Sequence, residues 1–224
     1  TDYYTERLAG ERLRRVYEIA PARVQQYLES EIAHVLSYTA PDQEVLELGC
    51  GYGRVALRLA QKARRVVGID VAEDSLHLAR ELGRFYSGCD FRCMDALHLD
   101  FSNETFDLVV CIQNGICAFG VDPGALIAES LRVLRPGGAA LFSTYTDAFW
   151  EHRLAWFERQ AEEGLLGPID YSATGNGTIV STDGFRAGRL TASELETVCA
   201  NLGIRPSLRD VDGSSLFCEI RKHR

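Results

Sequence analysis

The chain has 224 residues, of which 46% are hydrophobic and 25% charged, and its formal net charge is −8. This length allows one or two domains with a sizeable core, and the composition is that of a soluble globular protein. The acidic balance argues against a broad nucleic-acid surface, which needs basic residues to neutralise phosphates, and no apolar stretch approaches the roughly 20 residues of a membrane helix.

The first elements are expected to be helices. Apolar residues recur at three- and four-residue steps over 11–38, and Pro21 should divide this stretch because its ring suits a helix start and not an interior. After a connector at 40–43, strands and helices alternate, which is typical of a parallel sheet covered on both faces. The expected strands are 44–48, 65–69, 89–93, 106–112 and 139–144, and the expected helices between them are 54–63, 74–85 and 123–134.

The pattern changes after Thr144, where a helix and a glycine-rich segment replace the strand–helix alternation. Asp183-Gly184 separates two strand-like runs and predicts a β-hairpin. Thr191 and Glu194 have the spacing of a capping box at a helix start. The expected elements here are a helix over 147–163, hairpin strands over 177–182 and 185–190, a helix from 191 to 202, and a closing antiparallel pair over 205–211 and 215–221.

Three glycines at alternate positions follow the first expected strand. The segment Glu47-Leu48-Gly49-Cys50-Gly51-Tyr52-Gly53 ends an apolar run, and the second strand ends at Asp70. Glycines let the backbone turn sharply and bring its N–H groups against a ligand. A carboxylate at the tip of the next strand can accept hydrogen bonds from the vicinal hydroxyls of a ribose. The pattern therefore predicts a nucleoside site, with a tight turn that binds nothing as the alternative.

The spacing of these glycines decides between two nucleoside cofactors. In the dinucleotide fingerprint G-x-G-x-x-G the third glycine would fall at Arg54, whereas this chain has Gly53. The pattern E-x-G-x-G-x-G resembles that of the class I S-adenosylmethionine-dependent methyltransferases. A nucleotide-dependent oxidoreductase is accordingly the weaker alternative.

The resemblance implies the fold and the domain organisation. It predicts an α/β, doubly wound, seven-stranded and mostly parallel sheet whose last strand is antiparallel, with N-terminal helices and an insertion after the fifth strand. We expect a single methyltransferase domain over 1–224. Its parts would be a helical N-terminal lid (1–40), a cofactor-binding core (41–144), a substrate-side insertion (145–189) and a C-terminal helix and strand pair (190–224).

The resemblance also implies the cofactor, S-adenosyl-L-methionine with S-adenosyl-L-homocysteine as its product, and the residues that hold it. Asp70 would bind the ribose, Val71 would pack on the adenine, and Asp95 would accept from the adenine amino group. Plain turn roles are the alternative for both aspartates. The full set of expected cofactor contacts is Glu47, Gly49, Gly51, Gly53, Asp70, Val71, Asp95, Ala96 and Gln113.

The acceptor side is less defined. In this family the end of the fourth strand faces both sulfonium and acceptor, and here it reads Gln113-Asn114-Gly115. This sequence fits neither the Asn/Asp-Pro-Pro-aromatic motif of nucleobase amine methyltransferases nor the metal-binding aspartate of catechol-type enzymes. Aromatic residues outside the core would complete the pocket. The expected substrate contacts are Tyr4, Tyr17, Asn114, Tyr145 and Trp150, with Tyr3, Arg153 and Trp156 as further candidates, and the catalytic candidates are Gln113, Asn114, Tyr145 and His152.

The expected activity is in-line methyl transfer to a small-molecule acceptor, a reaction that mainly needs alignment and exclusion of water. A cofactor-binding protein without transferase activity is the other alternative. No metal is expected, because Cys89 and Cys93 lack a second ligand pair, and the seven scattered cysteines suit free thiols in a reducing compartment. Without an apolar signal segment near the N-terminus we expect a cytoplasmic protein with no nucleic-acid or membrane partner. The sequence carries no signal for an oligomeric state.

Overall fold

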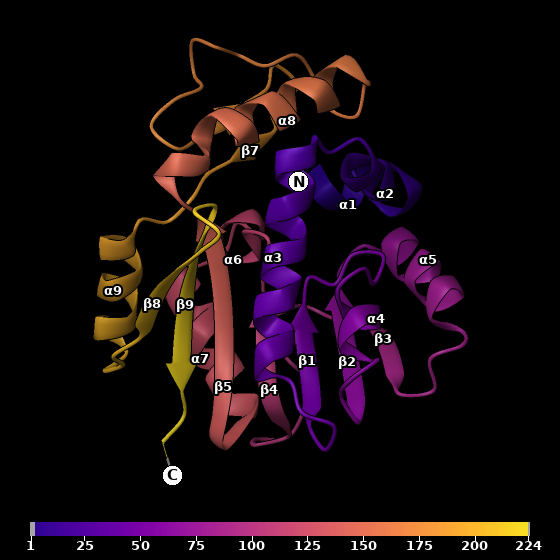
Figure 1. The fold of residues 1–224 in the computed structure, drawn as a ribbon, viewed down its shortest axis with the longest axis vertical. Coiled ribbons are helices and arrows are strands. Elements are labelled where there is room, and N and C mark those ends of the chain that lie inside the picture. Colours follow the sequence, from indigo (N-terminus) through magenta and orange to yellow (C-terminus); the bar gives the residue numbers. More distant parts are fainter. Residues whose placement is uncertain (1–2, 224) are drawn as a thin grey trace.

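A seven-stranded sheet forms the centre of the molecule in the computed structural model, which describes residues 3–223. The strand order within these residues is β3-β2-β1-β4-β5-β9-β8, with β9 antiparallel to both of its neighbours and the other pairings parallel. Figure 1 shows the carboxyl ends of the parallel strands at one edge of the sheet. The strands are β1 (Glu44–Leu48), β2 (Arg65–Asp70), β3 (Cys89–Cys93), β4 (Phe106–Cys111), β5 (Leu134–Tyr145), β8 (Ser207–Val211) and β9 (Ser215–Arg221).

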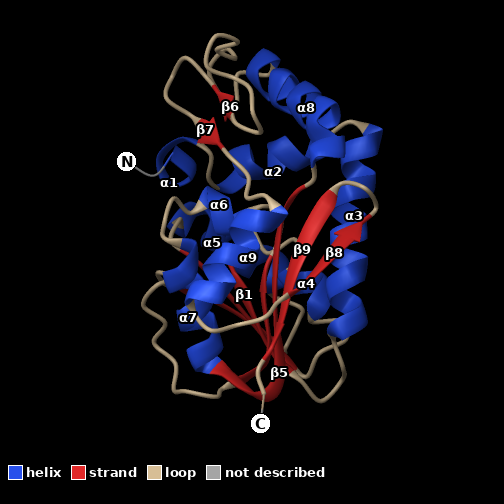
Figure 2. Ribbon diagram, turned by 90° about the vertical axis from the view of Figure 1, so that its left-hand side faces the viewer, coloured by secondary structure: helices blue, strands red, loops and turns tan. Residues whose placement is uncertain are grey.

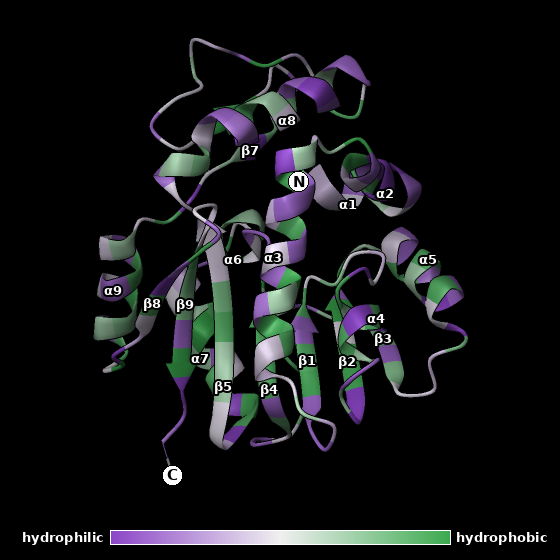
Figure 3. Cartoon of the chain, viewed as in Figure 1, coloured by the Kyte–Doolittle hydropathy of each residue, from purple (hydrophilic) through white to green (hydrophobic). Residues whose placement is uncertain are grey.

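Helices cover both faces because the central strands are apolar on both sides. On one face α7 (Pro123–Val133) and α9 (Ala192–Asn201) pack on alternate strand residues such as Leu46 and Val109. On the other face α3 (Ala22–Tyr38), α4 (Ala56–Leu59) and α5 (Glu73–Gly83) pack on Val45 and Val110. Figure 2 shows the sheet between α7 and α3, and Figure 3 shows the hydrophobic colouring concentrated on the strands. The doubly wound α/β fold is thus confirmed.

The carboxyl edge of the sheet is covered by segments from both ends of the chain. Helices α1 (Tyr3–Arg7) and α2 (Gly10–Glu18) lie there beside α8 (Trp150–Glu162), as Figure 1 shows. They share an apolar cluster with the insertion, and the Trp156 indole donates to the Val16 carbonyl at 3.0 Å. A short hairpin, β6 (Ile179–Val180) and β7 (Arg186–Ala187), belongs to the same layer. The expected N-terminal helices and insertion are both present.

Most element boundaries agree with the sequence expectations to within about two residues, and four differ. The hairpin strands expected over 177–182 and 185–190 shorten to the two-residue strands β6 and β7. The expected helix at 54–63 shortens to α4, because hydrogen-bonded turns replace helix on either side. Strand β5 begins at Leu134 rather than at 139. The Gly137 N–H donates to the Lys222 carbonyl at 2.7 Å, so backbone pairing along β5 extends into the segment that contains the glycines. The helix at 147–163 starts with a short 3₁₀ turn, η1 (Asp147–Phe149). The sequence reading did not include α1 or the single turn α6 (Gly115–Ala118).

Local signals explain where the helices begin. Asp122 caps α7 by accepting from the Ala125 N–H, with Pro123 at the first helical position. Thr191 and Glu194 form the expected capping box of α9. Within residues 3–223, no helix combines the length and the apolar character that crossing a membrane would require.

Candidate functional site

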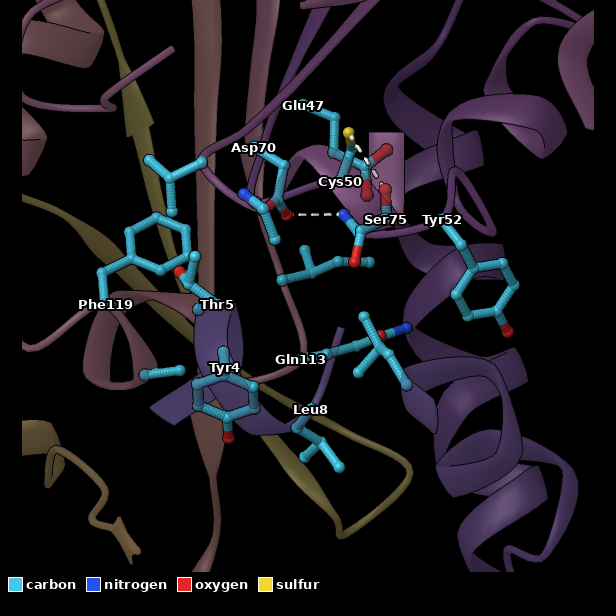
Figure 4. A pocket seen from close by; sticks show the side chains of 18 of the residues that line it. Tyr4, Thr5, Leu8, Glu47, Cys50, Tyr52, Asp70, Ser75, Gln113 and Phe119 are labelled. Carbon is cyan, nitrogen blue, oxygen red and sulfur yellow. Dashed lines mark hydrogen bonds between the residues drawn. The ribbon is translucent and has the colours of Figure 1, made fainter. Parts of the chain in front are cut away.

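A cavity of about 340 Å³ lies at the carboxyl edge of the sheet, beneath the N-terminal helices and α8. In open α/β sheets, ligands bind beyond the carboxyl ends of the strands, and the volume is within the usual range of small-molecule sites. Figure 4 shows Glu47 and Asp70 on one side of this cavity and Tyr4 and Leu8 on the other, with Gln113 between them. The cavity therefore joins the core to the segments that cover it.

The glycine loop and Asp70 form one hydrogen-bonded unit. The Asp70 carboxylate accepts from the Gly51 N–H at 2.8 Å and from the Ala72 N–H at 2.9 Å. Gly49 and Gly51 have positive φ angles of 69° and 51°, which side chains rarely adopt. A Cβ at Gly49 would also come within 2.5 Å of the Phe119 ring. This backbone can approach a ligand closely, and Asp70 fixes it at the cavity wall.

Gly53 has a different role from its two neighbours in the motif. It does not line the cavity, and a Cβ there would lie 2.8 Å from Phe91 and 3.3 Å from Ala79 of α5. The third glycine of this loop therefore allows close packing behind the loop, which is a contribution to the fold.

The expected adenine contacts gather at the ends of β2 and β3. Val71, Asp95 and Ala96 all line the cavity. The Asp95 carboxylate accepts from the Leu97 N–H at 2.8 Å and pairs with His98 Nδ1 at 3.0 Å, and these bonds lower the pKa of Asp95. Asp95 thus closes its own turn while it faces the cavity.

The end of β4 is held in an uncommon backbone conformation. Gln113 and Asn114 have φ angles of 56° and 64°, a region that is costly for residues other than glycine and that often marks functional positions. The Gln113 N–H donates to Glu31 Oε2 at 2.7 Å, and Ser215 donates to the other oxygen of Glu31. Gln113 lines the cavity, and its side-chain nitrogen is buried without a partner among the described residues.

Two buried glutamates lie at or below the cavity floor. Burial raises the pKa of Glu31 to about 7 and that of Glu47 to about 8. Nearby Arg54 opposes the shift at Glu47. Glu47 Oε2 is buried and accepts no hydrogen bond from residues 3–223. It is thus an unused acceptor at the carboxyl end of β1.

Aromatic side chains form the wall opposite the glycine loop. Tyr4, Tyr17 and Tyr145, which the sequence predicted as substrate contacts, line the cavity together with Trp156. Tyr17 contacts Tyr52 edge-on, with ring centroids 5.8 Å apart, and Trp156 at 6.1 Å. Burial raises the pKa of Tyr145 to about 12, so its hydroxyl is a hydrogen-bond donor at neutral pH and not a base.

Five residues expected on the acceptor side do not line the cavity: Tyr3, Asn114, Trp150, His152 and Arg153. The Asn114 side chain accepts from Thr144 at 2.9 Å and donates to the Gly188 carbonyl at 3.0 Å, so it fastens β5 to the insertion. His152 is exposed on α8. Trp150 lines a second hollow, next to Arg153 and the loop that contains Gly177. Tyr3 hydrogen-bonds Asp183 instead of lining the cavity.

Sequence reasoning missed other cavity residues. Arg54, Tyr52 and Gln160 line the cavity but were not expected there. Arg54 directly follows the glycine loop, so its place in the motif was the available signal. Gln160 sits on the buried face of α8, and nothing in the local pattern distinguishes it from a core position.

Comparison with known proteins places this geometry in a family. A family model described as "Methyltransferase domain" matches residues 45–138, which hold the glycine loop, Asp70 and the end of β4. Residues 45–138 therefore carry a methyltransferase domain. The domain's fold is also that of PH0226 from Pyrococcus horikoshii OT3, which is 23% identical over 99% of each chain with a TM-score of 0.68.

Curated relatives of this methyltransferase domain are longer proteins. The chain is 32% identical over 150 residues to the biotin biosynthesis bifunctional protein BioHC of Saccharophagus degradans, covering 64% of the chain and 26% of that protein. It is 35% identical over 105 residues to the ubiquinone biosynthesis O-methyltransferase of Idiomarina loihiensis, covering 46% of the chain and 42% of that protein. The matched segments thus span less than half of these two relatives.

Proposed function

We propose that this protein is an S-adenosylmethionine-dependent methyltransferase that acts on a small-molecule acceptor by in-line methyl transfer. The observation that carries the proposal is the unit of Asp70 and the glycine loop inside a cavity closed by the N-terminal helices and α8. One side of this cavity suits a nucleoside, and the other side provides an aromatic wall for a second ligand.

The residues present fit the cofactor. Each oxygen of Asp70 can accept more than one hydrogen bond, so Asp70 can hold the ribose hydroxyls while it keeps its bonds to the loop. Val71, Asp95 and Ala96 are placed for the adenine. The unused Glu47 Oε2 suits the ammonium of the methionyl end.

A small acceptor is supported by the size and the lining of the cavity. The cavity has a volume of about 340 Å³, and residues of the N-terminal helices and of α8 line it together with residues of the core. The net charge of −8 gives no basic field for nucleic acid. The names of the relatives, which refer to ubiquinone and biotin biosynthesis, support the same class of acceptor.

The cofactor supplies an activated methyl group, and the protein's own residues align the acceptor and exclude water. Tyr17, Tyr145 and Trp156 form an apolar wall that removes solvent from the acceptor. Gln113, fixed through Glu31, presents a neutral side chain where cofactor and acceptor meet. Because the cofactor activates the methyl group and the protein aligns the acceptor and excludes water, the reaction does not need a catalytic triad.

Titration calorimetry with S-adenosylhomocysteine and with NAD tests the proposal. We expect saturable binding of S-adenosylhomocysteine in the micromolar range, roughly −8 kcal/mol, and no binding of NAD. Binding of NAD alone would assign the site to a nucleotide-dependent oxidoreductase. Binding of S-adenosylhomocysteine without transfer to any acceptor would assign it to a cofactor-binding protein without transferase activity.

A further inference from the structure

Arg54 is a cavity residue with two buried hydrogen-bond donors that lack acceptors among the described residues. Its Nε and Nη2 atoms are buried, and within residues 3–223 neither finds a hydrogen-bond acceptor. The remaining nitrogen, Nη1, lies 3.9 Å from Glu29 on the outer side. A buried donor without an acceptor costs free energy, more so when it is charged. The arginine thus has two strong donors that the described residues do not satisfy.

The two donors without acceptors lie side by side on the guanidinium group of Arg54, which stacks on Tyr17. Its guanidinium carbon sits 4.7 Å from the centroid of the Tyr17 ring, so the ring covers one face of the planar group. Nε and Nη2 lie on one edge of that plane and form a fork of two parallel donors. Such a fork matches the two oxygens of a carboxylate.

The other buried cavity atoms without hydrogen-bond partners also favour a ligand that is rich in acceptor oxygens. Among described lining residues, four buried nitrogen donors have no partner, against one buried acceptor oxygen. A ligand that completes these bonds must offer more acceptor oxygens than donor groups. The atoms are Arg54 Nε, Arg54 Nη2, Gln113 Nε2 and Gln160 Nε2 as donors, and Glu47 Oε2 as the acceptor.

We propose that Arg54 binds the carboxylate of a ligand in this cavity through its Nε and Nη2 atoms. The inference rests on the proposed function, because it assigns a residue within the same site. Two ligands can supply the carboxylate: the methionyl end of the cofactor, next to Glu47, or an acidic acceptor, next to Tyr17 and Gln160. In both cases Arg54 selects a ligand that carries a carboxylate group.

Two nucleosides and three variants test whether the cofactor supplies the carboxylate that Arg54 binds. Calorimetry compares S-adenosylhomocysteine, which has the methionyl carboxylate, with methylthioadenosine, which lacks it. The proteins are wild type, Arg54→Met, Arg54→Lys and the control Arg58→Met, which removes an exposed arginine that pairs with the same Glu29 outside the cavity. If the cofactor supplies the carboxylate, Arg54→Met weakens S-adenosylhomocysteine by about 30-fold or more and leaves methylthioadenosine unchanged. Arg54→Lys should be intermediate, and Arg58→Met should match wild type.

A second titration, with S-adenosylhomocysteine already bound, tests whether the acceptor supplies the carboxylate. Acetate, benzoate and 4-hydroxybenzoate are titrated against their neutral amides. If the acceptor supplies the carboxylate, wild type binds at least one acid in preference to its amide, Arg54→Met loses that preference, and S-adenosylhomocysteine affinity is unchanged. Thermal unfolding of each variant checks that the fold is intact.

The inference is overturned if S-adenosylhomocysteine binds every variant equally and no acid is preferred over its amide in a way that depends on Arg54. That outcome leaves the proposed function standing, because the nucleoside still binds. Failure of wild type to bind S-adenosylhomocysteine would instead overturn the proposed function itself.

Discussion

Asp70 is the residue whose carboxylate joins the backbone of the glycine loop to the cavity. We predict that Asp70→Ala weakens S-adenosylhomocysteine binding by about 1.5–3 kcal/mol, the scale of a hydrogen bond to a charged group. The loss arises because the N–H groups of Gly51 and Ala72 lose their acceptor and the ribose loses its own. Calorimetry measures it, with Asp42→Ala in the exposed connector before β1 as the control. Equal affinity in a folded Asp70→Ala protein would show that the carboxylate only shapes the loop.

Glu31 makes stability depend on pH. Its pKa rises from the ordinary 4.5 to about 7 because it is fully buried. The folded state therefore holds a proton that the unfolded state has released between these pH values, so stability falls as pH rises from about 4.5 to about 7. The slope for one such proton is up to about 1.4 kcal/mol per pH unit.

We predict that Glu31→Gln makes this slope shallower by the contribution of one proton, because the amide stays neutral at every pH in the window. The slope that remains comes from Glu47, whose pKa is raised in the same direction. Denaturant unfolding at pH 5, 6, 7 and 8 measures it, and the exposed Glu29→Gln should retain the wild-type slope. A Glu31→Gln protein with an unchanged slope would mean that Glu31 is already ionised throughout this range.

Arg153 connects helix α8 to the segment that contains the β6–β7 hairpin. Its guanidinium donates to the carbonyls of Gly177, Ala187 and Gly188, with N···O distances of 2.6–3.1 Å, and lies 4.3 Å from the centroid of the Tyr145 ring. It is 1% exposed. One buried cation thus connects the insertion to an aromatic residue of the cavity.

We predict that Arg153→Met lowers the free energy of unfolding by roughly 3 kcal/mol, because buried carbonyls lose their donors. Arg159→Met, which changes an exposed arginine on the same helix, should have little effect. Denaturant unfolding compares the two variants. Equal stabilities would show that the carbonyls find other donors.

Helix α1 is held to the hairpin through Asp183. The Tyr3 hydroxyl donates to Asp183 Oδ2 at 2.6 Å, and Arg7 pairs with the same oxygen at 3.1 Å. Both tyrosines of α1, Tyr3 and Tyr4, also contact the Phe185 ring edge-on. Helix α1 is therefore held to the insertion mainly through the Asp183 carboxylate and the Phe185 ring.

We predict that Asp183→Ala speeds amide hydrogen exchange over 3–8 by about tenfold, because the loosened helix opens more often. S-adenosylhomocysteine affinity should change less than about threefold, since the core contacts remain. Hydrogen-exchange mass spectrometry measures the first effect, and Asp170→Ala, elsewhere on the insertion, is the control. Unchanged exchange in Asp183→Ala would show that packing on Phe185 alone holds α1.

For the whole molecule, the strength of the local signal decided how well the sequence predicted each part. The alternation of strands and helices, the capping box of α9 and the break at Pro21 are set by neighbouring residues, and the structure confirms them. The length of helix α4 was overestimated, because the turns on either side of it contain residues that favour helix but lack a continuous series of helical hydrogen bonds.

The cavity was harder to predict because it is assembled from distant segments. The glycine loop and Asp70 are visible as a motif, whereas the partners of Asn114, at Thr144 and Gly188, lie 30 and 74 residues away. The helical phase of α8 turns Trp156 and Gln160 inward and His152 outward, and no local signal fixes that phase. Buried atoms such as Arg54 Nη2 become informative only when their surroundings are known.

Methyl transfer to a small molecule can be followed directly with a labelled cofactor. The protein is incubated with S-adenosylmethionine labelled on the methyl group and with a metabolite extract, and both S-adenosylhomocysteine and the distribution of label are followed. We expect S-adenosylhomocysteine above the level of an Asp70→Ala control and an equal amount of label in a compound of low molecular mass. Label confined to macromolecules, or no S-adenosylhomocysteine above the control with any extract, would contradict it.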